Sequence, residues 1–426
     1  MTAEPSPQSP SLPEVAAAIE QAATRLHGVV ATTPLERSVR LSAEVGAEVL
    51  LKREDLQPVR SYKVRGAYNL IAQLDAAARA RGVVTASAGN HAQGVAYACA
   101  ALDIRGRIHL PSGTQRQKRE RIAAIGGDRV EVVMGAETYD EVFEAAQADA
   151  AASGATLVPA FDDPRVIAGQ GTVIREVVRQ LGGAPDVVVV PVGGGGLIAG
   201  TVAWLRTHHP ATRVVGVEPA GSANLAAALA AGEPVPLVDL DTFVDGAAVR
   251  RAGRHTTATV LAGGAELVAE PEGSVCSEML SLYQVDGIIA EPAGALATGA
   301  LASGTVVVEP GQTVVCVLSG GNNDVSRYAE VVERALVHEG RKHYFLVDFP
   351  QEPGALRQFL DEVLGPDDDI TLFEYVKRSN REVGPALVGI ELTRAADLDS
   401  LLARMDAAPP TIEKIDSESP LFRFLL

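Results

Sequence analysis

Cysteine is scarce in this 426-residue sequence, which contains only Cys99, Cys276 and Cys316. Three scattered cysteines are too few for a disulfide framework, and their spacing does not match a zinc site. A protein without such a framework has no need of an oxidising compartment, so we expect it in the reducing cytoplasm.

Positive charge is also scarce, with 37 lysine and arginine residues against 54 aspartate and glutamate residues and a formal net charge of -17. An acidic surface repels the phosphate backbone of nucleic acids and the head groups of anionic lipids. We therefore expect neither nucleic acid nor a membrane as a partner. The charge carries no information about the fold.

Hydrophobic runs long enough to span a membrane are missing as well. Residues 187–205 form a stretch of 19 uncharged residues, but Pro191 and four successive glycines (193–196) interrupt it. That pattern indicates a strand, a turn and a helix. Residues 1–11 are rich in proline and serine and lack an apolar run, so we expect a flexible tail there rather than a signal peptide.

The sequence does contain short β-branched runs that alternate with alanine-rich helical segments. The runs include residues 130–133, 187–190, 213–218 and 313–319, and the helical segments include 139–153, 169–181 and 197–208. Continuous apolar strands are typical of sheets covered on both faces, and alternation with helices predicts βαβ units. We therefore predict an α/β fold with parallel open sheets, in two subdomains, over residues 12–335.

The pattern changes after Arg341. A strand is predicted at 343–349, a helix between Pro353 and Gly365, a hairpin of strands 370–377 and 385–392 around a polar turn, a helix at 395–407 and a strand near 411–415. The order βαββαβ is the ferredoxin-like arrangement of the α+β class. This segment contains no convincing nucleophile–base pair or metal cluster, so we interpret residues 342–426 as a separate binding or regulatory domain.

Two of the loops that follow predicted strands carry a lysine and an asparagine. Lys63 lies in the segment SYKVRGA, and a reactive lysine there would need desolvation or nearby positive charge to lower its pKa. Asn90 lies in the segment SAGNH, whose small residues let backbone N–H groups point at an anion. The alternatives are a solvated lysine and an Asx turn that caps the next helix.

Two further loops are rich in glycine or begin with serine. Residues 193–196 are four glycines between an apolar strand and a helix, where a backbone can wrap around a phosphate group. Ser319 begins the segment SGGNN after another apolar strand. Because open α/β sheets bind ligands at the carboxyl ends of their strands, we expect all four loops to meet there.

The glycine segment also permits a competing interpretation. Gly194, Gly196 and Ala199 match the pattern G-x-G-x-x-G/A, and Glu218 ends the next strand at the distance expected for an acid that binds a ribose. Taken locally, this pattern indicates a nicotinamide-dependent oxidoreductase. Such an enzyme, however, has no reason to carry the lysine and asparagine loops.

The combination of motifs resembles a known family. The segments TPLERS, LLKREDLQPVRSYKVRGA, SAGNHAQGVA, PVGGGGL, EPAGA and SGGN occur in the order and spacing of the fold-type II (tryptophan-synthase-β-like) pyridoxal-phosphate enzymes. More narrowly, residues 12–426 resemble the biosynthetic threonine dehydratases, or threonine ammonia-lyases.

The resemblance implies a role for each motif. Lys63 would form the Schiff base with pyridoxal 5′-phosphate and act as the catalytic base, Asn90 would bond the 3′-oxygen of the cofactor ring, and Ser319 would meet the pyridine nitrogen. Glu291 would lie near the substrate. The phosphate would be bound by Gly193, Gly194, Gly195, Gly196 and Leu197, and the substrate carboxylate by Ser87, Ala88, Gly89, Asn90 and His91.

The implied reaction is the elimination of water and ammonia from L-threonine to give 2-oxobutanoate, the first step of isoleucine biosynthesis, with L-serine as a possible second substrate. Serine racemases carry a serine where this chain has Ala88, so racemisation lacks its acid here. Some relatives hold a divalent ion with a Glu and an Asp beyond the strand that carries Glu218. Because Asn224 occupies the second position, we expect no metal ion.

The C-terminal segment resembles the ACT-like regulatory domain of the same family, present once. The resemblance implies isoleucine as an inhibitor, valine as its opponent, and a homotetramer or homodimer. Two alternatives stay open on sequence alone: a serine-preferring or catabolic relative, and a non-catalytic amino-acid sensor that has kept the scaffold.

Overall fold

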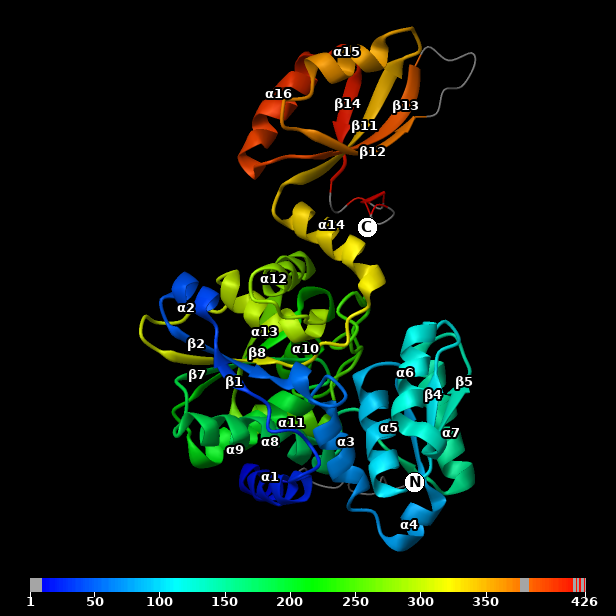
Figure 1. The fold of residues 1–426 in the computed structure, drawn as a ribbon, viewed down its shortest axis with the longest axis vertical. Coiled ribbons are helices and arrows are strands. Elements are labelled where there is room, and N and C mark those ends of the chain that lie inside the picture. The colour runs from blue at the N-terminus through cyan, green and yellow to red at the C-terminus, as the bar shows by residue number, and fades with distance from the viewer. Residues whose placement is uncertain (1–9, 376–382, 417–418, 420, 423–424, 426) are drawn as a thin grey trace. The chain divides into compact units, whose positions relative to one another are not determined.

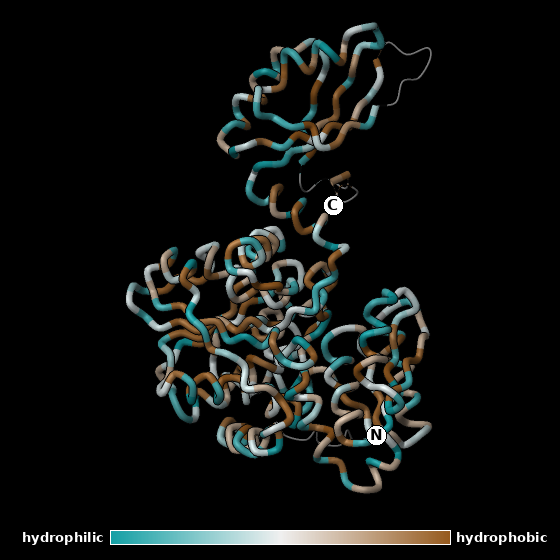
Figure 2. Tube along the Cα trace, in the orientation of Figure 1, coloured by the Kyte–Doolittle hydropathy of each residue, from teal (hydrophilic) through white to brown (hydrophobic). Residues whose placement is uncertain are grey.

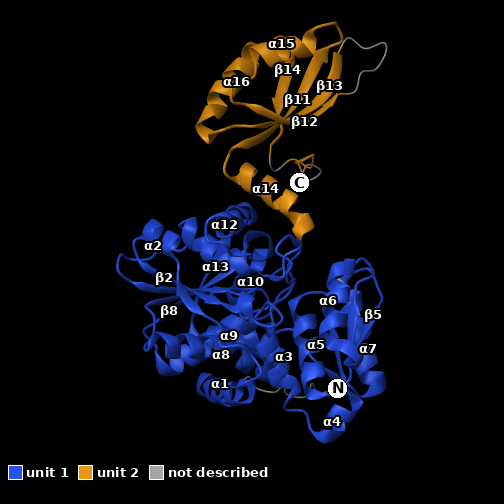
Figure 3. Ribbon diagram, viewed as in Figure 1, with its two compact units in different colours: residues 1–324 blue, residues 325–426 orange. Residues whose placement is uncertain are grey.

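The computed structural model describes residues 10–375 and 383–416, together with 419, 421, 422 and 425. The chain divides into two compact units, residues 1–324 and 325–426, which Figure 3 shows in different colours. Each unit has its own hydrophobic core and is described separately. The expected tail at residues 1–11 falls largely outside the described residues. Ser11 is described, and its side chain takes part in a capping box at the first helix.

The first unit contains a six-stranded sheet in the order β1-β2-β10-β7-β8-β9. Only β1 pairs antiparallel, and every other neighbouring pair in this sheet is parallel. The central strands β7 and β10 are almost wholly buried, as expected for apolar runs covered on both faces. The strands are β1 (Leu35–Arg37), β2 (Glu48–Arg53), β7 (Val187–Pro191), β8 (Arg213–Pro219), β9 (Glu266–Glu270) and β10 (Thr313–Leu318).

Helices cover both faces of this sheet (Figure 1). One face is covered by α2 (Val39–Val45), α12 (Glu272–Gln284) and α13 (Pro292–Ala302), and the other by α1 (Leu12–Leu26), α8 (Pro164–Leu181), α9 (Gly196–His208) and α11 (Arg254–Gly263). A further helix, α10 (Asn224–Ala231), follows β8. Among the residues described, no helix is both long and apolar enough to cross a membrane.

A smaller, fully parallel sheet in the same unit has the order β5-β4-β3-β6. Its strands are β3 (Val83–Ala86), β4 (Gly106–Leu110), β5 (Val130–Met134) and β6 (Thr156–Leu157), and its helices are α4 (Ala76–Arg81), α5 (Asn90–Leu102), α6 (Arg116–Gly126) and α7 (Tyr139–Ser153). The expectation that the run at 130–133 is buried on both faces is wrong. Strand β5 is an edge strand with only partly buried valines, because nothing pairs with its outer side.

Helix α3 (Lys63–Ile71) packs against α5 of the smaller sheet and against α8 of the larger one. Glycine permits the close crossings of α8. A Cβ added at Gly169 would collide with the backbone of Arg65, and one at Gly200 on α9 would lie 2.7 Å from the backbone of Gly171 on α8. Helix α8 therefore fixes the spacing between α3 and α9, the two helices that begin at the lysine and glycine loops.

The second unit is a four-stranded antiparallel sheet in the order β12-β13-β11-β14, with two helices on one face. Brown, hydrophobic segments of its strands line the interior in Figure 2. The chain order β11-α15-β12-β13-α16-β14 is the predicted ferredoxin-like arrangement. The elements are α14 (Tyr328–His338), β11 (Lys342–Pro350), α15 (Ala355–Glu362), β12 (Asp369–Tyr375), β13 (Val383–Glu391), α16 (Leu398–Ala407) and β14 (Thr411–Lys414).

The predicted fold class is confirmed: parallel α/β sheets are followed by an α+β domain. The predicted helix at 139–153 matches α7, and a capping box of Thr138 and Glu141 accounts for where it begins. The polar turn predicted at 378–384 lies almost entirely outside the described residues.

Candidate active site

The lysine loop and the serine loop are tied together by their backbones. Ser61 forms an antiparallel bridge with Gly320, and the Tyr62 backbone N–H donates a hydrogen bond of 3.2 Å to the Ser319 carbonyl. Lys63 follows directly as the first residue of α3. The structure therefore brings two of the four predicted loops into direct contact.

The amine of Lys63 has one hydrogen bond, a long one of 3.4 Å to the Ala160 carbonyl. Two other lysines of this unit are engaged more tightly. Lys52 is fully buried and donates to the Thr33 carbonyl, Glu176 and Gln180 over 2.5–2.9 Å, while Lys118 pairs with Asp245 at 2.9 Å. Lys63 is thus the described lysine of this unit whose amine is most weakly held.

The glycine loop lies next to the carbonyl that Lys63 contacts. Phe161 follows Ala160, and its ring packs so closely on Gly194 that a Cβ there would collide with it. Gly195 has a φ of 88°, in the left-handed region that favours glycine. Helix α9 begins at Gly196, and no described side chain caps its N-terminus.

Three helix N-termini meet around this loop. The Thr256 hydroxyl of α11 donates to the Gly194 carbonyl at 2.8 Å, and the Asn224 amide of α10 donates to the Gly193 carbonyl at 3.1 Å. A helix N-terminus carries partial positive charge and attracts an anion.

Carboxylates already cap two of these three helices. Asp162 accepts from the backbone N–H groups of the first residues of α11, and Glu218 accepts from those of Leu225 and Ala226 in α10 over 2.7–2.9 Å. Only α9, which follows the glycine loop, lacks such a cap. The arrangement therefore favours an external anion, such as a phosphate group, at the N-terminus of α9.

The position of Glu218 argues against the nicotinamide alternative. The carboxylate is buried and both of its oxygens accept backbone hydrogen bonds from α10, so it is not free to bind a ribose. Burial raises the pKa of Glu218 to about 7, against the opposing effect of those two hydrogen bonds. Among the described residues, no group of three or more His, Cys, Asp or Glu side chains is arranged to hold a metal ion.

Asn90 is the first residue of α5, and its amide is held on two sides. Its Nδ2 donates to Glu291 Oε1 at 2.5 Å, and its Oδ1 accepts from Asn322 Nδ2 at 2.7 Å. Glu291 is buried at the start of α13. Burial raises the pKa of Glu291 to about 7, and the negative charge of Asp245 adds to that effect.

The rest of the asparagine loop forms a turn before α5. The Gly89 backbone N–H donates to the Ser87 hydroxyl at 3.3 Å, Gly89 is the N-cap residue of α5, and Ala88 offers only a methyl group. His91 is buried with its Nε2 3.0 Å from the Val158 carbonyl. Burial lowers the pKa of His91 to about 4, which favours the neutral imidazole.

Ser319 follows β10 and is buried, with its hydroxyl donating to the Ala293 carbonyl at 3.2 Å. Phe161, Asp162 and Thr256 could not be predicted from the sequence, because their contacts join residues far apart in the chain and leave no local pattern. Asn322 stood in the segment SGGNN, but nothing in that segment pointed to its contact with Asn90.

Comparison with known proteins identifies the family. Residues 26–320 match the family described as pyridoxal-phosphate dependent enzyme, and residues 333–425 match the C-terminal regulatory domain of threonine dehydratase. The chain is 61% identical to L-threonine dehydratase biosynthetic IlvA of Mycobacterium tuberculosis over 96% of this chain and 95% of that protein. The corresponding protein of Corynebacterium glutamicum is 53% identical over 96% and 95%.

The chain belongs to the biosynthetic threonine dehydratase family of pyridoxal-phosphate dependent enzymes. Among solved structures, it is similar to the processed form of threonine deaminase isoform 2 from Solanum lycopersicum, with a TM-score of 0.72 and 37% identity over 76% of this chain and 93% of that one. Maize serine racemase has a TM-score of 0.70 at 27% identity, over 78% and 99%. The family resemblance predicted from sequence is confirmed.

The residues present fit the cofactor that the family uses. The uncapped N-terminus of α9 and the glycines before it suit a phosphate group. The weakly held Lys63 amine contacts the carbonyl of Ala160, the residue before the phenylalanine that packs on that loop. A neutral, buried hydroxyl at Ser319 suits a pyridine nitrogen. Pyridoxal phosphate is therefore the cofactor of this chain, as predicted.

Proposed function

We propose that this chain is a threonine dehydratase that converts L-threonine into 2-oxobutanoate and ammonia at the site around Lys63. The observation that carries this function is that the weakly held Lys63 amine contacts the Ala160 carbonyl, and the next residue, Phe161, packs on the glycine loop before the uncapped N-terminus of α9. The high identity to biosynthetic threonine dehydratases supports threonine as the substrate and isoleucine biosynthesis as the purpose.

Lys63 would hold the cofactor through its amine, while the backbone of Gly193, Gly194, Gly195, Gly196 and Leu197 would hold the phosphate. Bound pyridoxal phosphate supplies an electron sink for negative charge at the substrate α-carbon. When free, the Lys63 amine would serve as the base that takes the α-proton of the substrate.

Ser319 offers the pyridine nitrogen a neutral partner. The one proton of the Ser319 hydroxyl is donated to the Ala293 carbonyl in this structure, and the hydroxyl would have to turn to donate to the nitrogen. It would not hold the nitrogen protonated, whereas an aspartate would. A neutral partner at Ser319 would therefore favour elimination of the β-hydroxyl over reactions that need a protonated pyridine nitrogen.

The turn from Ser87 to His91 would receive the substrate carboxylate. The N-terminus of α5 has no side-chain cap, so a carboxylate there would gain from the helix dipole. Ala88 places a methyl group where a racemase carries a hydroxyl. The turn can therefore orient the substrate but offers no acid from that position for the opposite face of the α-carbon.

The decisive experiment adds L-threonine to the purified full-length chain with bound cofactor and measures 2-oxobutanoate. Formation of one 2-oxobutanoate for each L-threonine consumed, over many turnovers, supports a dehydratase. If no 2-oxobutanoate forms although the cofactor spectrum is intact, the sensor alternative is supported. L-Serine in the same assay should give pyruvate with little D-serine. D-Serine formed at a comparable rate would contradict the role assigned to Ala88.

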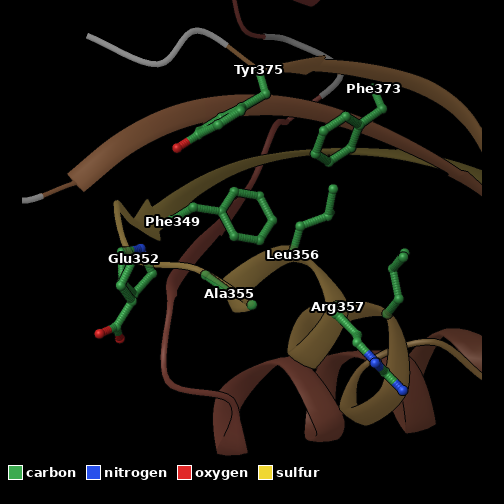
Figure 4. A pocket seen from close by; sticks show the side chains of 10 residues that line it. Phe349, Glu352, Ala355, Leu356, Arg357, Phe373 and Tyr375 are labelled. Atoms are coloured by element: carbon green, nitrogen blue, oxygen red, sulfur yellow. The ribbon is translucent and has the colours of Figure 1, made fainter. Parts of the chain in front are cut away.

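The second unit contains a cavity of about 410 Å³ that suits a free amino acid. Figure 4 shows Phe349, Leu356, Phe373 and Tyr375 turned toward one another around it. The Phe349 ring lies 6.0 Å from that of Phe373 and 5.8 Å from that of Tyr375, measured between centroids. These rings form an apolar wall of the kind that receives a branched aliphatic side chain.

Polar groups near this apolar wall match the charges of an amino acid. Glu352 lies at the edge of the cavity and would attract an ammonium group. Gly354 precedes α15 without a side-chain cap, so the N-terminus of α15 would attract a carboxylate. We therefore propose that residues 342–426 bind isoleucine as an inhibitor and valine as its competitor at this cavity.

Filling the cavity tests this assignment. Leu356→Trp should abolish the isoleucine response, while Leu346→Trp, on β11 outside the cavity lining, should leave it unchanged. Equal isoleucine sensitivity in both variants would place the effector elsewhere.

We further propose a cytoplasmic homotetramer or homodimer. The three cysteines are free and buried, which is compatible with a reducing compartment, and single regulatory domains of this type commonly pair between subunits. The mass of the full-length chain in solution, measured by sedimentation, distinguishes the two assemblies from a monomer.

A further inference from the structure

The amide of Asn90 sits in a chain of hydrogen bonds whose direction is fixed. At one end, the Val59 backbone carbonyl accepts from Asn322 Nδ2 at 2.8 Å. The same nitrogen donates to Asn90 Oδ1 at 2.7 Å, and Asn90 Nδ2 donates to Glu291 Oε1 at 2.5 Å. At the other end, the Asn322 backbone N–H donates to Glu291 Oε2 at 3.2 Å.

Chemistry at both ends determines which way the Asn90 amide points. A backbone carbonyl can only accept, so the Asn322 amide must turn its nitrogen toward Val59. The second hydrogen of that nitrogen then requires an oxygen on Asn90. On the other side, Glu291 Oε1 accepts from Asn90 Nδ2 while Glu291 Oε2 accepts from the Asn322 backbone N–H, so the Asn90 nitrogen faces Glu291. Both constraints select the same orientation.

Glu291 itself is held in place by packing. The carboxylate is 4% exposed, and a Cβ added at Gly320 would collide with its Oε1. One at Gly246 would lie 3.6 Å from the same oxygen. The charges of Asp245 and Lys118 act on it from outside the chain of hydrogen bonds. The Glu291 oxygen that accepts from Asn90 is therefore held in position by the residues packed around it.

We propose that Glu291 and Asn322 are positioning residues that set the polarity of the Asn90 amide, so that its one unused N–H faces the oxygen of the cofactor ring. An amide nitrogen has two hydrogens, and only one is given to Glu291. A reversed amide would present an oxygen to the ring oxygen and repel it. This inference rests on the proposed role of Asn90 in cofactor binding.

At pH 8, where Glu291 is ionised, exchanging the polarity of the two neighbours tests the proposal without changing the net charge. Glu291→Gln leaves one acceptor for two donors, the Asn90 amide and the Asn322 backbone N–H, and Asn322→Asp places an acceptor where a donor is needed. In the double variant, the side chain at position 291 donates to Asn90 and the side chain at position 322 accepts from it. The Asn90 amide can then flip and regain both hydrogen bonds. The double variant retains one defect, since Asp at 322 no longer donates to Val59.

Two quantities separate positioning from packing. The first is thermal stability of the cofactor-free full-length chain, and the second is its affinity for pyridoxal phosphate, followed by absorbance titration. Each single variant should lose affinity by about tenfold, the value of roughly one hydrogen bond. The double variant should be more stable than either single variant yet keep the low affinity, because its amide is reversed.

Asn323→Asp is the matched control. Its amide donates to the Ala290 carbonyl at 3.3 Å and makes no contact with Asn90, so cofactor affinity should change by less than about threefold. If a single variant does not fold, Asn322→Ala serves instead. It frees the Asn90 amide to turn without adding a charge, and it should lower kcat more than it raises KM.

The outcomes are distinct. Recovery of both stability and native cofactor affinity in the double variant would mean that the two neighbours only fill space, and the proposal would fail. Native affinity in both single variants would overturn it as well. A native chain that binds no cofactor at all would instead contradict the proposed function, which is a different result.

Discussion

At the scale of single residues, the polar groups available to bind a cofactor are those with few hydrogen-bond partners in the protein. Lys52 gives its three N–H groups to three acceptors, whereas Lys63 has one long contact. Sequence could identify Lys63 because its motif is contiguous. It could not identify Asn322 as a partner of Asn90, because those residues are 232 positions apart.

Ser319→Asp should alter the course of the reaction. A carboxylate in place of the hydroxyl would keep the pyridine nitrogen protonated and stabilise negative charge in the ring. Elimination should slow by about tenfold or more, and side reactions such as transamination should increase. The measurement is the ratio of 2-oxobutanoate to pyridoxamine phosphate formed. Unchanged rates and spectra would mean that Ser319 does not touch that nitrogen.

Glu291 should make stability depend on pH. Burial raises the pKa of Glu291 to about 7 from an ordinary value of 4.5. Between these two pH values, the folded chain holds a proton on Glu291 that the unfolded chain has released. Stability from this group is complete below pH 4.5 and is lost as the pH rises through 7, by an amount on the order of 3 kcal/mol. Glu218, with the same direction of shift, contributes in the same window.

Glu291→Gln removes one of these two contributions. Denaturant unfolding of the cofactor-free chain at pH 5 and pH 8 should show a smaller loss of stability in the variant than in the native chain. The comparison uses the difference between the two pH values, so a uniform destabilisation of the variant does not affect it. An equal loss in both proteins would show that Glu291 is already ionised at pH 5.

At the scale of elements, the site is held by helices that begin at loops and cross at glycines. The helix at 139–153 was predictable because Thr138 and Glu141 form a local capping box. The cap of α11 was not, since Asp162 reaches α11 across more than 90 residues. The partial burial of β5 was also unpredictable, because an edge position is set by the sheet and not by the valines themselves.

Gly200→Ala should displace α9 from α8. The added methyl group would meet the backbone of Gly171 at 2.7 Å, a contact that neither helix can relieve by side-chain rotation. We expect a loss of about 1–3 kcal/mol in the free energy of unfolding, together with weaker cofactor binding, because the N-terminus of α9 moves. Gly183→Ala is the control, since nothing lies within 4 Å of its added methyl group. If Gly200→Ala were as stable as the native chain, the crossing of α8 and α9 would accommodate a methyl group, and the close contact with Gly171 would not limit the packing of these helices.

At the scale of the whole molecule, one chain combines a catalytic α/β unit with a separate α+β unit. An effector acts only through different affinities for two states of the enzyme. The change from parallel to antiparallel strands could be predicted from sequence, because the strand patterns differ on either side of Arg341. The cavity proposed to bind the effector could not, since it is lined by residues from β11, α15 and β12 that meet only after folding.

A chain that ends at Glu339 should keep the cofactor spectrum and lose the response to isoleucine. The native response should correspond to a coupling free energy of about 1–3 kcal/mol. Threonine saturation curves with and without isoleucine, and sedimentation of both proteins, separate lost regulation from lost assembly. Inhibition of the shortened chain as strong as that of the native chain would place the effector site in the first unit.

The central claim is that Lys63 carries pyridoxal phosphate for the deamination of threonine. Its most direct test is borohydride reduction of the full-length holoenzyme, followed by mapping of the pyridoxyl peptide, with and without prior addition of L-threonine. We predict a single labelled lysine, Lys63, with labelling that falls while threonine is turned over to 2-oxobutanoate. A label on Lys52 or Lys118, or an unchanged label on Lys63 during turnover, would contradict the claim.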